Sequence, residues 1–243
     1  MRALPRFLNR RLAMTSLVVA GAALALAACD KGAGGAAAEG DMSLGAAEGA
    51  TVTVIEYASV TCVHCAAWNQ DVWPEFKAKY VDTNRIRYVF REFPTPPTEV
   101  AAAGFILARC AGKDHYFEVI DGIMRGLPEI QQGQARPVLL RVAQSVGISE
   151  EQFQTCVQNP DNIAAMEARA RAAQDAGISG TPTFLVNGTR VQDFSMAGLS
   201  AAIDPLLGDA APAPAPAAQP SQPAATTETT PAGQTTPATQ PAA

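Results

Sequence analysis

The stretch TVTVIEYASVTCVHCAAW, residues 51–68, decides the fold of this chain. Residues 51–59 are rich in β-branched and aromatic side chains, which is the composition of a buried strand. The chain then enters Cys62-Val63-His64-Cys65, and residues 66–80 have helical character, interrupted at Trp73-Pro74. A strand, a C-x-x-C motif and a helix in succession are typical of a redox-active dithiol.

The two cysteines of this motif are expected to behave differently. Cys62 begins the helix, where free N–H groups and the helix dipole stabilise a thiolate. Cys65 lies one turn further on, close enough to form a small disulfide with Cys62 and more shielded from solvent. His64 can add a positive charge or a hydrogen bond to the thiolate, which lowers its pKa and makes the disulfide more oxidising. The motif therefore predicts catalysis on sulfur, without a metal or an organic cofactor.

Other uses of a cysteine pair fit this sequence less well. A structural zinc site usually needs two such pairs, and the sequence contains one C-x-x-C. Haem attachment requires a histidine directly after the second cysteine, where this chain has Ala66. A purely structural disulfide in so small a loop would be strained. A metal-binding or metallochaperone role for Cys62, Cys65 and His64 stays open as an alternative.

The remaining pattern is that of an α/β protein. Residues 85–93 alternate in polarity and predict a second strand, which a cluster of prolines ends. Asn187-Gly188 predicts a type I′ hairpin turn between strands at 183–186 and 189–191. Helices are expected over residues 99–111, 115–124, 137–146, 150–158, 161–176 and 196–207.

Two segments on either side of the helical stretch make the chain resemble a known family. Glu56-Tyr57-Ala58-Ser59 before the motif and Gly180-Thr181-Pro182-Thr183-Phe184 far downstream resemble the thioredoxin superfamily. Within it, the chain is similar to the DsbA-like thiol:disulfide oxidoreductases of the bacterial periplasm. The resemblance covers residues 51–208 and implies a thioredoxin fold with an inserted helical subdomain at about residues 98–160.

The resemblance also implies roles for individual residues. It implies a cis peptide bond before Pro182, facing the cysteines, and pairing of the Thr181 backbone with a substrate peptide. Glu56 matches the family's buried acid, which would move a proton when Cys65 is released; a solvent-facing strand position is the alternative. The family's best-known member has proline at the position of Val63 and a different residue at the position of Thr181. Whether this chain acts as an oxidase or as a reductase or isomerase therefore stays open.

Cys110 and Cys156 both fall within the helical stretch. Some members of the family carry a structural disulfide there, and such a bridge would stabilise the subdomain by about 2–4 kcal/mol. Two buried free thiols are the alternative, which is less suited to an oxidising compartment.

The first 28 residues predict a secretory signal, because four arginines and no acid precede an apolar run at 17–28. Leu26-Ala27-Ala28-Cys29 resembles the lipobox of bacterial lipoproteins, in which the cysteine is lipidated. Lipid on Cys29 leaves four cysteines that can form two pairs, whereas ordinary cleavage would leave Cys29 free. Asp30 resembles the residue that keeps such lipoproteins at the inner membrane. The expected location is therefore the periplasm, with the protein tethered to the inner membrane.

Composition predicts the character of the two segments that flank the domain, and the net charge limits the kinds of partner. Residues 29–50 are rich in Gly and Ala and predict a flexible tether, and the Pro/Ala/Thr-rich residues 209–243 predict a disordered tail. Loss of the four signal arginines takes the net charge from −5 to about −9, which argues against nucleic-acid binding. Expected partners are exported client proteins with cysteines, and a membrane quinone-linked reoxidase or, for a reductase, an electron donor.

Overall fold

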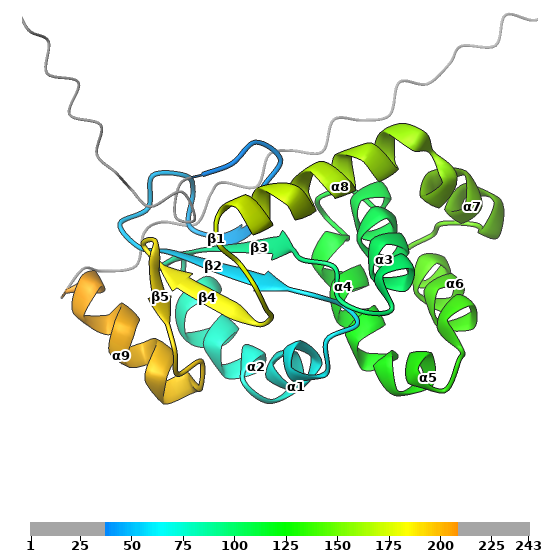
Figure 1. Ribbon diagram of the computed structural model, residues 1–243. Coiled ribbons are helices and arrows are strands. Elements are labelled where there is room, and N and C mark those ends of the chain that lie inside the picture. The colour runs from blue at the N-terminus through cyan, green and yellow to red at the C-terminus, as the bar shows by residue number, and fades with distance from the viewer. Residues whose placement is uncertain (1–36, 209–243) are drawn as a thin grey trace, which may run out of the picture.

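The computed structural model describes residues 37–208, which contain a five-stranded sheet of order β1-β3-β2-β4-β5 (Figure 1). The central pair β2–β3 is parallel, and the other neighbouring strands are antiparallel. The strands are β1 (Met42–Gly45), β2 (Thr53–Ala58), β3 (Arg87–Glu92), β4 (Thr183–Val186) and β5 (Thr189–Val191). The predicted signal peptide, Cys29 and the predicted tail lie outside the described residues.

Helices cover both faces of the sheet and extend beyond one of its ends (Figure 1). Helix α8 crosses one face, α1, α2 and α9 lie on the opposite side, and α3 to α7 gather next to the sheet. The helices are α1 (Val63–Asp71), α2 (Trp73–Phe76), the π-helical turn η1 (Lys77–Val81), α3 (Thr98–Cys110), α4 (Tyr116–Arg125), α5 (Leu127–Gln131), α6 (Ala135–Ser145), α7 (Glu150–Gln158), α8 (Pro160–Asp175) and α9 (Met196–Leu207). The structure is the predicted α/β thioredoxin fold with a helical insertion.

Local sequence signals account for most element boundaries. Pro74 sits in the first turn of α2, and the break between α1 and α2 falls where the sequence predicts it. Asn187 and Gly188 have φ angles of 47° and 84°, as a type I′ turn requires. Ser149 caps α7 in a complete capping box with Gln152. The short helix α5 was not predicted, since five residues carry too little periodicity.

The tether prediction is wrong for the residues that form β1. Met42–Gly45 pairs antiparallel with β3, and the Met42 side chain is buried. Arg91 fixes the segment from the sheet side, because its guanidinium donates two hydrogen bonds to the Asp41 carboxylate, at 2.9 and 2.8 Å. Four residues flanked by Gly and Ala show no hydrophobic period, so this strand is specified by its partner and not by its own sequence.

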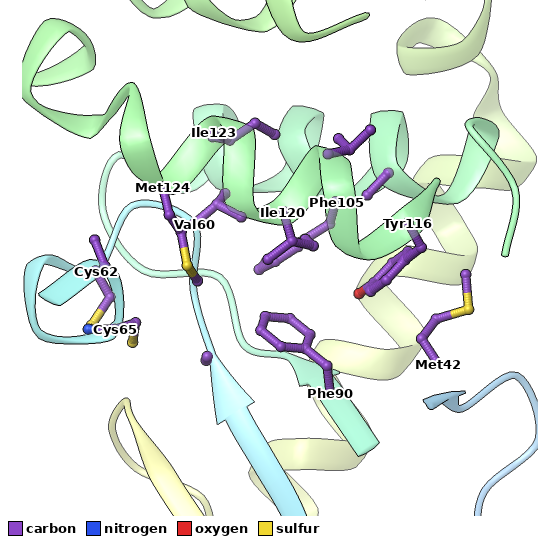
Figure 2. Close-up of a cluster of buried hydrophobic side chains, with 14 of the residues drawn as sticks. Met42, Val60, Cys62, Cys65, Phe90, Phe105, Tyr116, Ile120, Ile123 and Met124 are labelled. Carbon is purple, nitrogen blue, oxygen red and sulfur yellow. The ribbon is translucent and has the colours of Figure 1, made fainter. Parts of the chain in front are cut away.

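A continuous apolar core joins the sheet to the helical insert. Phe90 on β3 faces side chains from α3 and α4, among them Phe105, Tyr116 and Ile120, and Cys62 and Cys65 lie at the margin of this core (Figure 2). A second, smaller core lies under α8 on the opposite face of the sheet. The cysteine motif is therefore supported from below by packed side chains.

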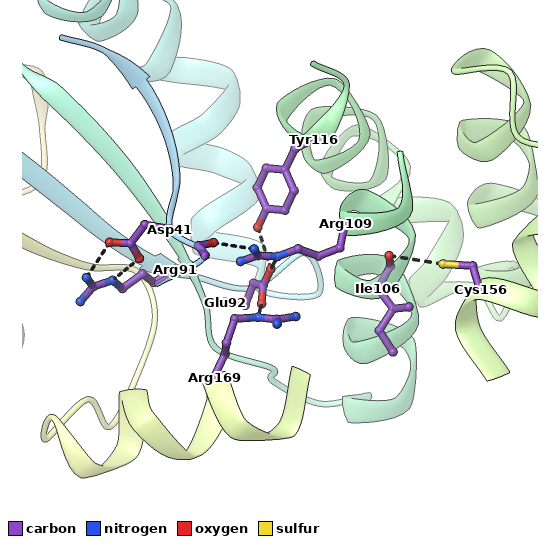
Figure 3. Close-up of polar contacts among 9 residues, drawn as sticks. Asp41, Arg91, Glu92, Ile106, Arg109, Tyr116, Cys156 and Arg169 are labelled. Carbon is purple, nitrogen blue, oxygen red and sulfur yellow. Dashed lines mark hydrogen bonds and ion pairs between the residues drawn. The ribbon is translucent and has the colours of Figure 1, made fainter. Parts of the chain in front are cut away.

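Glu92, the last residue of β3, is the polar joint between the sheet and the insert (Figure 3). Its buried carboxylate accepts hydrogen bonds from Arg109 of α3 at 2.6 Å, from Tyr116 of α4 at 3.0 Å, and from Arg169 of α8. Three helices thus converge on one carboxylate at the end of the strand.

A disulfide joins Cys110 at the end of α3 to Cys156 in α7, with 6.5 Å between the Cα atoms. The bridge, and not the alternative of two free thiols, is the state found in the structure. Within residues 37–208, no helix combines the length and the apolar character that crossing a bilayer requires.

Candidate active site

Cys62 is placed by the strand that precedes it and the helix that it begins. It is the N-cap of α1, with φ −87° and ψ 118°, and its Sγ accepts a hydrogen bond from the backbone N–H of Cys65 at 3.2 Å. The loop from β2 is held by Thr61, whose hydroxyl donates to the carbonyl oxygen of Thr95 at 2.8 Å. The cysteine sulfur therefore occupies the place that an N-cap oxygen usually takes.

This position lowers the pKa of Cys62 from its ordinary 9.0 to about 6. The largest cause is a hydrogen bond from the Cys65 thiol, and the side chain of Thr181 and the backbone N–H groups of Cys65 and His64 lower the pKa further. Partial burial of Cys62 acts in the opposite direction. Near neutral pH the sulfur is therefore mostly a thiolate.

Cys65 has the opposite character. It is fully buried, and both this burial and the neighbouring Cys62 raise its pKa well above its ordinary value. Both cysteines are free thiols in this structure. An incoming thiol or disulfide can therefore meet Cys62, which is 9% exposed, but not Cys65.

The segment before β4 closes the other side of the motif. The Thr181–Pro182 peptide bond is cis, as the family resemblance implied. The Cys62 sulfur lies 3.5 Å from the Thr181 carbonyl oxygen, to which it donates a hydrogen bond when it is protonated. Residues 119 positions apart in sequence are thus brought into direct contact at the reactive sulfur.

Glu56 lies in β2 beneath the cysteines and is 2% exposed, so the alternative of a solvent-facing position is wrong. Burial raises the pKa of Glu56 from 4.5 to about 8; a hydrogen bond from the Tyr88 hydroxyl lowers it, and the charge on Cys62 raises it. A carboxyl group with such a pKa can both give and accept a proton near neutral pH.

His64 contributes through its backbone, because its N–H group is among the causes that lower the pKa of Cys62. Its side chain is exposed and lines a groove of about 400 Å³ together with Trp68, Asp71 and Phe194. Trp68 is fixed there by its indole N–H, which donates to the Phe194 carbonyl oxygen at 2.8 Å. The groove therefore begins at the cysteine motif itself and continues along α1.

The described residues do not provide a site of the kind that a metal-binding role would need. Between residues 37 and 208, no three side chains of His, Cys, Asp or Glu gather closely enough to hold a metal ion. Cys62, Cys65 and His64 do not form such a group, since His64 points to solvent while Cys65 is buried. This part of the chain offers a dithiol and no metal-binding set.

Two residues of the site were missed from the sequence. Tyr88, the partner of Glu56, is an ordinary aromatic residue of a strand until the pairing of β2 with β3 is known. Phe194 comes after the hairpin, and its place over α1 follows from the return of the chain through β4 and β5. Neither residue carries a local signal.

The sequence model of a family described as Thioredoxin matches residues 37–205. The chain belongs to the thioredoxin family. Among solved structures, this thioredoxin-family chain is similar to alpha-DsbA1 of Wolbachia pipientis, with a TM-score of 0.65 and 24% identity over 71% of this chain and 93% of that one. It is also similar to BdbD of Bacillus subtilis, with a TM-score of 0.61 and 22% identity over 69% and 92% of the two chains. Its fold is thus of the DsbA-like kind.

A relative in sequence is a chain of Rickettsia conorii named as a protein-disulfide oxidoreductase. The two are 38% identical over 176 residues, which are 70% of this thioredoxin-family chain and 61% of the relative. The chain thus matches about three fifths of the length of that relative.

Proposed function

We propose that this chain is a thiol:disulfide oxidoreductase that forms or exchanges disulfides in exported proteins through the pair Cys62–Cys65. The observation that carries the proposal is the environment of the Cys62 sulfur. It accepts the Cys65 N–H at 3.2 Å at the start of α1 and faces the Thr181 carbonyl at 3.5 Å beside cis-Pro182. The name of the Rickettsia relative supports the same reaction.

In the oxidase direction, a client thiolate attacks the Cys62 sulfur of the Cys62–Cys65 disulfide. The bond between the two cysteines breaks, and Cys65 leaves with the electron pair and takes a proton, because its burial disfavours the thiolate. A second client thiolate then attacks the client sulfur of the mixed disulfide and displaces Cys62. The client leaves with one disulfide, and the protein holds two reduced cysteines.

The low pKa of Cys62 favours this direction. A thiol with a low pKa is a good leaving group, and stabilising the thiolate stabilises the reduced protein over its disulfide form. We assign to Glu56 the transfer of a proton to and from Cys65, since its carboxyl group interacts electrostatically with that sulfur. We assign to Thr181 and Pro182 the binding of the client backbone, beside the reactive sulfur.

Location and partners follow from the sequence signals. We assign the chain to the periplasm, held at the inner membrane by lipid on Cys29, with exported proteins as clients and a membrane quinone-linked partner as reoxidant. Mass spectrometry of the mature protein tests the anchor: a lipidated N-terminal Cys29 supports it, and an unmodified Cys29 excludes it.

The reaction is tested with the full chain and a peptide that contains two thiols. We expect Cys62→Ser to abolish peptide oxidation and Cys65→Ser to accumulate a mixed disulfide with the peptide. The Cys110→Ala/Cys156→Ala variant, which lacks the other bridge, is the matched control and should oxidise the peptide. Oxidation by Cys62→Ser at the unsubstituted rate would exclude the assigned role of this pair.

The direction of exchange is tested by the redox potential of the pair. A value near the roughly −120 mV of a strong oxidant supports the oxidase, whereas one near the roughly −270 mV of thioredoxin would favour a reductase.

A further inference from the structure

We infer that Tyr88 is a positioning residue for the reaction, which stabilises the charged, proton-accepting form of the Glu56 carboxyl group through a buried hydrogen bond. This inference rests on the proposed function and assigns a part of the site that neither the cysteine motif nor the cis-proline segment supplies.

The geometry places Tyr88 beside Glu56 on one face of the sheet. In the parallel pairing of β2 with β3, Val54 is opposite Tyr88 and Glu56 is opposite Phe90. Tyr88 is therefore the diagonal neighbour of Glu56 on the same face, within reach of a long side chain. Its hydroxyl donates a hydrogen bond to Oε2 of Glu56.

The Tyr88 ring is held in place on several sides. It is 3% exposed and packs against Trp73, with ring centroids 4.6 Å apart, and against Phe76 and Phe117 at 6.2 and 6.0 Å. These rings come from α2 and α4, so the hydroxyl cannot turn away from Glu56 without disturbing the packing of both helices. The donor is therefore pre-positioned before any proton moves.

A buried carboxylate needs such a donor. Removing the ion from water favours the neutral acid, and a hydrogen bond to the ionised form opposes this effect. Desolvation is the largest cause that raises the pKa of Glu56, and Tyr88 is the hydrogen-bond donor that lowers it. Tyr88 in turn stays neutral, because burial and the Glu56 charge both raise its pKa.

The other groups that act on this pair are few. Cys62 and Cys65 interact with Glu56 from the start of α1, and Tyr116 of α4 interacts with Tyr88. In the strand on its other side, Glu56 is opposite Phe184 of β4, which does not titrate. The Tyr88 hydroxyl is thus the neutral donor to Glu56, and the other titratable groups that act on the pair are two thiols and the Tyr116 phenol.

The step that depends on this arrangement is the attack by Cys65 on a mixed disulfide at Cys62. Cys65 gives its proton to the Glu56 carboxylate, and its sulfur forms a bond with the Cys62 sulfur. The bond between Cys62 and the client breaks, and the client leaves as a thiolate. The protein pair is oxidised and the client sulfur is reduced, so electrons and protons balance.

The test uses the full chain with glutathione bound to Cys62 as a mixed disulfide, and measures glutathione release against pH. With Glu56 as the proton acceptor, the rate should rise with an inflection at the pKa of Glu56, which burial raises above its ordinary 4.5 even where Cys62 carries no charge. Tyr88→Phe removes one hydrogen bond to a charged group and should move this inflection upward by about one pH unit, with about tenfold slower release at pH 7.

Two controls separate positioning from structure. Tyr116→Phe removes another buried hydroxyl, which donates to Glu92 at 3.0 Å, and should leave the inflection in place. In a Glu56→Gln background the inflection should be absent, and adding Tyr88→Phe should change nothing further. The carboxyl band of Glu56 in the infrared spectrum of the reduced protein should show the same upward shift in Tyr88→Phe without any turnover.

An unchanged Glu56 titration in folded Tyr88→Phe protein would overturn the inference, and so would an equal shift in Tyr116→Phe. Neither result would affect the proposed function, which fails only if Cys62 is dispensable. Urea unfolding of each variant at the assay pH shows that the proteins compared are folded.

Discussion

The Sγ of Cys62 lies 3.2 Å from the backbone nitrogen of Cys65, so the first cysteine of the motif caps the helix that contains the second. A thiolate is a better acceptor for this N–H group than a thiol. Ionisation of one cysteine and formation of the first turn of α1 therefore support each other.

Cys62 should titrate as an unusually acidic thiol. In the reduced protein, thiolate absorbance in the ultraviolet should titrate with a midpoint of about 6, and this transition should be absent from Cys62→Ser. A midpoint near the ordinary value of 9.0 would contradict the helix-cap account of the site.

The same shift makes the stability of the reduced protein depend on pH. Because the folded pKa of Cys62 is lowered, its contribution is complete above the unfolded value of 9.0 and is lost as the pH falls through about 6. Between pH 7 and pH 5 the reduced protein should lose about 1 kcal/mol relative to Cys62→Ser. Urea unfolding of both proteins at the two pH values measures this difference.

Glu56 should have the opposite pH dependence. Its folded pKa is raised, so its contribution is complete below 4.5 and is lost as the pH rises through about 8. Glu56→Gln should therefore become more stable than the unsubstituted protein by an amount that grows by roughly 3 kcal/mol from pH 5 to pH 8. Unfolding of the oxidised forms isolates this effect from the cysteines. A gain independent of pH would show that the acid is not desolvated.

Glu92 should matter more for stability than any exposed acid. Glu92→Gln leaves Arg109 and Arg169 without their shared carboxylate at the joint between sheet and insert, which should cost about 3 kcal/mol in the free energy of unfolding. Glu129→Gln is the matched control, because the ion pair of Glu129 with Arg141 is exposed and contributes at most about 1 kcal/mol. Equal losses in the two variants would refute the assigned role of the joint.

The second disulfide should stabilise the insert without taking part in exchange. Removing it by Cys110→Ala/Cys156→Ala releases a bridge across 46 residues and should lower the free energy of unfolding by about 2–4 kcal/mol. Hydrogen exchange should accelerate first in α3 and α7, which the bridge joins. Unchanged protection of these two helices would show that their packing alone holds them together.

The sequence predicts those parts of the fold whose signals are local. The strand before Cys62, the hairpin turn at Asn187 and the longer helices of the insert follow from composition, period or caps, whereas the short helix α5 does not. Strand β1 has no such local signal, since it forms and buries Met42 only by pairing with the edge of β3.

The site divides in the same way. Cys62 and Cys65 are a local motif, and Glu56 and Pro182 follow from the resemblance to a family. Tyr88 depends on the register between two strands, which no short stretch of sequence encodes. The contribution of the His64 backbone N–H to the low pKa of Cys62 was not predicted, whereas the predicted role of its imidazole stays a prediction.

Both tryptophans, the sources of tryptophan fluorescence, lie in one part of the fold. Trp68 and Trp73 are the only tryptophans of the chain, and their ring centroids lie 5.9 Å apart beside the cysteine motif. Tryptophan fluorescence therefore reports directly on this corner, because residues 98–160 contain no tryptophan. Melting of the insert by itself would reach the tryptophans only through the core that they share with it, whereas circular dichroism would report the loss of its helices directly.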